Sequence, residues 1–230
     1  MARVDTGGNK SASLSQRIVL AIIRSVFRVI FCWKVKGKEN IPSNDPFIVI
    51  ANHVHLLDPI LLELSLPRWI NFMAKDELFR SPFLRLILRW AQVFSVQRQG
   101  TIKKKQQALR RARDLLGTGQ ILGMFPEGSR SRDGKLRMGK PGSAVIAARI
   151  DVAIIPIGIV GTDKIKGINW LWKRPGIVVN IGEPFKVPQI EGKLNRPQMK
   201  SLTDLMMRRI SALLPPENRG VYLNDEKHGD

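Results

Sequence analysis

Short apolar runs alternate with stretches of helical periodicity along most of this chain, and this alternation constrains its fold more than any other feature. Residues 47–51 and 152–159 are apolar runs of strand length, whereas 103–116 repeats its apolar residues at helical spacing. The same patterns predict further strands at 69–74, 93–96, 120–125 and 177–181, and further helices at 59–66, 81–91, 141–149 and 197–213. We therefore expect a single α/β domain with a largely parallel sheet flanked by helices.

The N-terminal region differs from this pattern. Residues 1–13 are small and polar, and we expect a disordered tail. The apolar stretch 14–33 contains Arg17, Arg24 and Arg28, which fall within about 40° of one another on a helix. A membrane-spanning helix would bury these charges at a cost of roughly 2.5–3.5 kcal/mol each. No small-residue cleavage site follows the stretch, so it does not fit a signal peptide.

We therefore expect residues 14–36 to form an amphipathic helix on a membrane surface, with the protein peripheral or monotopic on the cytoplasmic face. Lys34, Lys36 and Lys38 would add attraction to anionic lipid. The alternative is a helix packed on the protein's own core. We expect the remaining domain to span 37–214, and 215–230 is polar enough to predict a loose tail.

The chain of 230 residues carries a net charge of +19, which favours anionic partners such as a membrane surface, acidic small molecules or nucleic acid. Aromatic residues are not interleaved with the basic run 98–113, so no nucleic acid is expected. A single cysteine, Cys32, and three histidines make a transition-metal site improbable.

Three polar loops follow predicted strands, at 52–58, 96–98 and 125–131. Functional loops gather beyond the carboxyl ends of strands in such sheets. The first loop offers His53 with Asp58 five residues on, a pair that suits a general base and its orienting carboxylate. The other two offer Arg98 and Arg130, whose guanidinium groups bind phosphates.

These loops resemble the sequence blocks of the glycerolipid acyltransferase family. Asn52 to Asp58 is similar to the family's His-x4-Asp block, and Val96-Gln97-Arg98 to its second block. Residues 125–131 are similar to Phe-Pro-Glu-Gly-Thr-Arg-Ser, with Ser129 in the threonine position, and 155–158 to the fourth block. The resemblance covers about 46–188. The departure is His55, where the family commonly has Ser or Thr.

The resemblance implies an acyltransferase in which His53 is the general base and Asp58 orients it. The substrate hydroxyl would attack an acyl thioester, acyl-CoA or acyl carrier protein, with no other cofactor. The implied acceptor is a lysophospholipid, 1-acylglycerol 3-phosphate, and its product is phosphatidic acid. Glycerol 3-phosphate or another lysolipid is the alternative acceptor, and a non-catalytic basic protein that binds anionic membrane or nucleic acid is the alternative of another class.

The implied phosphate-binding set comprises residues from the second and third blocks and from the following helix: Arg98, Lys105, Glu127, Gly128 and Arg130. Within it, Glu127 is expected to hydrogen-bond a glycerol hydroxyl or to orient Arg130. The N–H of Gly128 is expected to stabilise the developing oxyanion.

Overall fold

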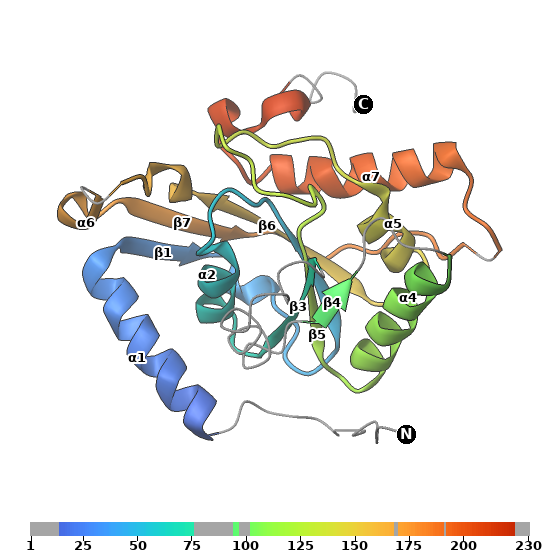
Figure 1. Ribbon diagram of the computed structural model, residues 1–230, viewed down its shortest axis with the longest axis horizontal. Helices are drawn as coiled ribbons and strands as arrows, with labels where there is room; N and C mark the ends of the chain where they lie inside the picture. The colour runs from blue at the N-terminus through green and yellow to red at the C-terminus, as the bar shows by residue number, and fades with distance from the viewer. Residues whose placement is uncertain (1–13, 76–93, 97–101, 168–169, 191, 224–230) are drawn as a thin grey trace.

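A computed structural model describes residues 14–75, 94–96, 102–167, 170–190 and 192–223 (Figure 1). The predicted tail at 1–13, the predicted helix at 81–91 and Arg98 lie outside the described residues. The described residues form one α/β domain, as the alternation of apolar runs predicted.

The described strands form one sheet with the order β1-β7-β6-β2-β5-β3-β4. Its strands are β1 (Cys32–Lys36), β2 (Phe47–Ala51), β3 (Ile70–Lys75), β4 (Phe94–Val96), β5 (Ile121–Met124), β6 (Ala153–Val160) and β7 (Gly176–Ile181). Neighbours pair in parallel except β6 and β7, which are antiparallel. The prediction of a largely parallel sheet is therefore confirmed, and β1 and β7 run opposite to the rest.

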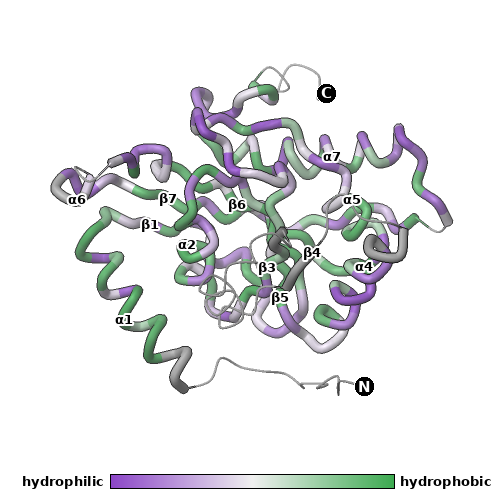
Figure 2. The backbone as a smooth tube through the Cα atoms, viewed as in Figure 1, coloured by the Kyte–Doolittle hydropathy of each residue, from purple (hydrophilic) through white to green (hydrophobic). Residues whose placement is uncertain are grey.

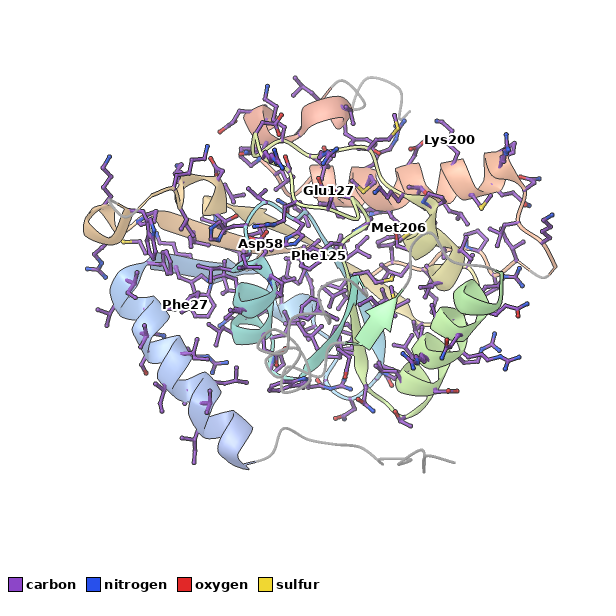
Figure 3. All side chains as sticks on the ribbon, viewed as in Figure 1. Phe27, Asp58, Phe125, Glu127, Lys200 and Met206 are labelled. Atoms are coloured by element: carbon purple, nitrogen blue, oxygen red, sulfur yellow. The ribbon has the colours of Figure 1, made fainter. Side chains whose placement is uncertain are left out.

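Helices cover both faces of the sheet, because side chains alternate between its faces along each strand. In β2, Ile48 and Ile50 join a core with α4 (Ile102–Gly117), α5 (Pro141–Ala147) and α7 (Arg196–Ser211). Phe47 and Val49 join a second core with α1 (Leu14–Ile30) and α2 (Asp58–Ser65). Figure 3 labels a buried residue from each helical layer, Phe27 on α1 and Met206 on α7.

The remaining described elements are short: η1 (Lys38–Asn40), η3 (Thr162–Lys164), α6 (Trp170–Lys173), η4 (Pro216–Asn218) and η5 (Gly220–Tyr222). No helix within the described ranges is both long enough and apolar enough to cross a membrane.

The predicted helix over 14–36 is too long. α1 ends at Ile30, and 32–36 form β1, which pairs with β7. The reason is the alternation in Cys32–Lys36: Trp33 and Val35 are partly buried, whereas their neighbours along the strand are exposed. This period of two fits a sheet edge and not a helix. The domain therefore begins before residue 37.

The prediction of a loose tail from 215 is wrong for 215–223. The main-chain oxygen of Asn218 accepts the N–H of Leu136 at 2.8 Å, and the Asn218 side chain donates to the Gly134 oxygen at 2.8 Å. Tyr222 is buried. This C-terminal segment therefore packs against the loop 130–139.

Candidate active site

The site forms where β2 and β5 end. These strands are adjacent and parallel, with Ile50 opposite Met124, so the loops that follow them emerge at the same edge of the sheet. Asn52 fixes the first loop: its side chain donates to the Ile159 oxygen at 2.8 Å and accepts the Ile159 N–H at 2.7 Å. Two hydrogen bonds thus hold the chain after β2 against β6 immediately before His53.

Asp58 holds His53 in one orientation. The Oδ2 atom of Asp58 lies 2.9 Å from Nδ1 of His53, and it also accepts the N–H groups of Val54 at 2.6 Å and His55 at 2.7 Å. The Asp58 side chain is fully buried, whereas that of His53 keeps 17% of its surface exposed. If a carboxylate oxygen of Asp58 accepts from Nδ1, the lone pair of the imidazole lies on Nε2, which is then the atom available to act as a base.

Aromatic packing fixes the imidazole from one side. The ring of His53 stacks on Phe125 with centroids 4.2 Å apart, and Phe125 stacks on Phe72 at 5.7 Å. Phe125 is the first residue after β5, so both β2 and β5 contribute to the position of the imidazole. Figure 3 shows Asp58, Phe125 and Glu127 gathered at the centre of the molecule.

Glu127 ties together two segments of main chain. Its Oε1 accepts the N–H of His53 at 2.7 Å, and its Oε2 accepts the N–H of Arg137 at 3.0 Å. Burial raises the pKa of Glu127 to about 7, and the hydrogen bonds from His53 and Arg137 oppose this rise. These contacts give Glu127 a positioning role between the two segments, and its predicted contact with a glycerol hydroxyl or Arg130 stays a prediction.

Gly128 forms a tight turn. Its φ of 72° lies in the left-handed region that favours glycine. Its N–H donates to the Phe125 oxygen at 2.9 Å, so the donor that we expected to face the oxyanion is used within the turn.

A basic pocket of about 650 Å³ is lined by Ser129, Arg130, Arg132, Asp133 and Arg137. The N–H of Ser131 donates to the main-chain oxygen of His53 at 2.7 Å and so joins the pocket loop to the segment that carries His53. The sequence prediction included Arg130 and missed Arg137. The only sequence feature that points to Arg137 is the group of basic residues that follows the third block.

The structure thus brings His53, Asp58, Glu127, Gly128 and Arg130 together. Lys105 lies in α4, and Arg98 lies outside the described residues.

The N–H of His55 donates to Asp58, and its Nδ1 accepts the N–H of Leu57 at 3.3 Å. Burial lowers the pKa of His55; the Asp58 charge opposes this shift, and the Arg130 charge adds to it. Its imidazole therefore takes part in the turn that carries Asp58. Within the described ranges, there is no group of three or more His, Cys, Asp or Glu side chains that could hold a metal ion.

Comparisons with known proteins identify relatives. A stretch of 132 residues is 36% identical to the chloroplastic 1-acyl-sn-glycerol-3-phosphate acyltransferase LPAT1 of Arabidopsis thaliana, covering 57% of this chain and 36% of that protein. The 1-acyl-sn-glycerol-3-phosphate acyltransferase of Bacillus subtilis is 29% identical over 78% of this chain and 87% of its own. The chain therefore spans much less than two thirds of the chloroplastic relative and most of the bacterial one.

A solved structure supports the same relationship. The crystal structure of the 1-acyl-sn-glycerophosphate (LPA) acyltransferase PlsC from Thermotoga maritima matches with a TM-score of 0.60 and 29% identity, over 86% of this chain and 80% of that one. The family model described as Acyltransferase matches residues 32–160, from β1 to the end of β6. Because this match spans more than half of the 230 residues and contains the whole site, the chain belongs to the Acyltransferase family.

Proposed function

We propose that this protein transfers a fatty acyl group from acyl-CoA or acyl carrier protein to the free hydroxyl of 1-acylglycerol 3-phosphate, giving phosphatidic acid. The observation that carries this proposal is the juxtaposition of an oriented histidine base with a pocket lined by arginines. The names of the relatives from Arabidopsis thaliana and Bacillus subtilis support the same acceptor.

In this mechanism Nε2 of His53 accepts the proton of the acceptor hydroxyl while its oxygen attacks the thioester carbonyl. The tetrahedral intermediate then collapses, the carbon–sulfur bond breaks, and the imidazolium returns its proton to the leaving thiolate. Asp58 stabilises the imidazolium and maintains its tautomer, as the carboxylate does in a Ser-His-Asp triad. The acceptor alcohol is itself the nucleophile, so the reaction needs neither an acyl-enzyme nor a further cofactor.

The acceptor phosphate would bind in the basic pocket. Arg130 lines this pocket, and its neighbour Ser131 is hydrogen-bonded to the main chain of His53. A phosphate bound there would place the attached glycerol hydroxyl near the base. Arg98 and Lys105 remain predicted phosphate ligands, and we expect no nucleic acid partner.

We further propose that α1 attaches the protein peripherally or monotopically to an anionic membrane, on its cytoplasmic face. One face of α1 buries Phe27 against the core, Phe31 directly after the helix is also buried, and Arg24 donates to the Leu64 oxygen at 3.1 Å. The other face exposes apolar side chains: Ile18, Val19, Ile22, Val26 and Val29. Figure 2 shows α1 as a mostly hydrophobic helix at one side of the molecule. Such a face suits the membrane interface.

The experiment that tests the activity is an assay of the purified full chain against a panel of acceptors with both donor types. The acceptors are 1-acylglycerol 3-phosphate, glycerol 3-phosphate and 1-acylglycerol, which lacks the phosphate. We expect transfer to the first and little to the last. His53→Ala should abolish transfer and keep liposome binding, whereas failure of the wild type with every thioester would favour a non-catalytic binding protein.

A further inference from the structure

The basic pocket contains a fixed arginine that the family-like sequence blocks do not include. We propose that Arg137 binds the phosphate of the acceptor together with Arg130, and that this second guanidinium makes the site selective for a phosphorylated acceptor. This inference rests on the proposed acceptor site and deepens it.

The main chain of Arg137 is held at a set position relative to the base. Its N–H donates to Oε2 of Glu127 at 3.0 Å, and Oε1 of the same carboxylate accepts the N–H of His53 at 2.7 Å. Glu127 is 2% exposed, so water does not compete strongly for these bonds. A single buried carboxylate therefore links the segment that carries Arg137 to the segment that carries the base.

The side chain of Arg137 is braced as well. Its Nη1 donates to Oγ of Ser129 at 3.1 Å and approaches the Arg130 oxygen at 3.5 Å. Among the described residues, Nε and Nη2 of Arg137 make no hydrogen bond, and the residue is exposed. These two donors lie on the same side of a guanidinium, and they can bind two oxygens of a phosphate together.

The charge around Arg137 suits a dianion. Three arginines and one carboxylate, Asp133, line the pocket. Oδ1 of Asp133 accepts from Oγ of Ser131 at 2.6 Å and from the N–H of Lys135 at 3.2 Å, so this carboxylate shapes the turn. Arg132 makes no hydrogen bond to the described part of the chain, whereas both the main chain and the side chain of Arg137 are held by hydrogen bonds. Arg137 is therefore the better pre-organised partner for Arg130.

The test compares Arg137→Gln with Lys135→Gln in the purified full chain. Lys135 is exposed, lies in the same loop and does not line the pocket, so its substitution removes an equal charge nearby. The probe is glycerol 3-phosphate, titrated by calorimetry, with glycerol as the uncharged reference. We expect Arg137→Gln to raise the Kd at least about tenfold and Lys135→Gln to raise it less than about twofold. Thermal unfolding checks that both variants are folded.

Steady-state kinetics distinguish direct binding of the phosphate by Arg137 from a purely structural role of this residue. If Arg137 is a phosphate ligand, Arg137→Gln should raise the KM for 1-acylglycerol 3-phosphate and leave the KM for the thioester unchanged. Equal losses in Arg137→Gln and Lys135→Gln would reduce the effect to general electrostatics, and equal rises in both KM values would make Arg137 a brace only. Either result overturns the inference, as does wild-type protein that binds neither glycerol 3-phosphate nor 1-acylglycerol 3-phosphate.

The two proposals fail in different ways. Wild-type protein that binds glycerol 3-phosphate through Arg137 but transfers no acyl group would refute the proposed activity and leave the phosphate site standing. Acyl transfer by a protein whose Kd is insensitive to Arg137→Gln would refute this inference alone.

Discussion

The main-chain N–H of His53 donates to Oε1 of Glu127 over 2.7 Å, so a residue of the loop after β5 holds the proposed base of the loop after β2. The two residues are separated by 74 positions in the chain. The other oxygen of Glu127 accepts the N–H of Arg137. Both carboxylate oxygens of Glu127 therefore accept a main-chain hydrogen bond, and this arrangement suits the ionised carboxylate.

The first prediction concerns Glu127→Gln. The glutamine amide nitrogen cannot accept, so the N–H of either His53 or Arg137 would face another donor. A buried donor without an acceptor costs about 1–3 kcal/mol, which predicts a fall of about 2–12 °C in Tm for a chain of this size. We also expect kcat/KM to fall about 10- to 100-fold, because the base and the phosphate site lose their common support.

The control is Glu217→Gln, which removes an exposed carboxylate from η4. It should leave Tm and kcat/KM within error of the wild type. Equal behaviour of the two variants in both measurements would show that the hydrogen bonds of Glu127 have no energetic importance.

The second prediction concerns Asp58→Asn. Asparagine can still accept from the N–H groups of Val54 and His55, but it lacks the charge that stabilises the His53 imidazolium. We expect kcat to fall about 10²- to 10⁴-fold with little change in the acceptor KM. The exposed Asp45→Asn is the matched control. The double variant His53→Ala with Asp58→Asn should be no slower than His53→Ala alone, since the two residues act together; additive losses would contradict this.

The central part of the site could be predicted from the sequence because its positions follow from local patterns. The apolar runs that form β2 and β5 are short and fully buried, and polar residues begin where each run ends. Parallel neighbours end at the same edge, so His53, Asp58, Glu127 and Arg130 come together without any further information.

Other features depend on contacts between distant segments. Trp33 and Val35 of β1 follow directly on an apolar helix, so their alternation alone does not mark where that helix ends, and pairing with β7 fixes the strand. The position of Arg137 depends on its hydrogen bond to Glu127, ten residues earlier. The C-terminal segment 215–223 is polar, yet it is ordered by hydrogen bonds from Asn218 and by the burial of Tyr222.

The third prediction concerns the exposed face of α1. Val29 is 70% exposed and Ile22 is 59% exposed, so replacing both by serine should cost little stability. It should weaken binding to anionic liposomes by about tenfold, at about 25 cal/mol per Å² of apolar surface withdrawn from water. Co-sedimentation measures the effect. Val221→Ser, which changes a residue of similar exposure on η5, is the control. If the α1 variant bound anionic liposomes as tightly as the wild type, this helix would have a purely structural role.

The fourth prediction concerns pH and Glu63 on α2. Burial raises the pKa of Glu63 from 4.5 to about 8, while the Ile70 N–H and the Arg24 charge oppose this rise. The folded state therefore binds the Glu63 proton more tightly than the unfolded state. Between about pH 4.5 and pH 8 this group lowers the stability as the pH rises.

Glu63→Gln removes that charge and keeps an acceptor for Ile70. The free energy of unfolding of this variant should match the wild type at pH 5 and exceed it by about 1–4 kcal/mol at pH 9. Urea unfolding at both pH values measures the difference, and the exposed Glu39→Gln is the control. Parallel pH profiles for Glu63→Gln and the wild type would contradict the assigned shift.

The fifth prediction concerns the C-terminal segment. Gly220 has a φ of 55°, and a Cβ there would collide with the Leu136 carbonyl oxygen, in the loop that carries Arg137. Gly192 has a φ of 73° with open space around its Cβ position. Both alanine variants suffer backbone strain of order 1 kcal/mol, and only Gly220→Ala displaces the pocket loop.

We therefore expect Gly220→Ala to lose about 1–3 kcal/mol more stability than Gly192→Ala, as a steric and hydrogen-bond penalty. It should also raise the KM for 1-acylglycerol 3-phosphate, whereas Gly192→Ala should leave that KM unchanged. Urea unfolding and acceptor titrations measure the two effects. Because strain is common to both variants, an equal KM in the two would mean that the segment 215–223 stabilises the domain without positioning the phosphate site.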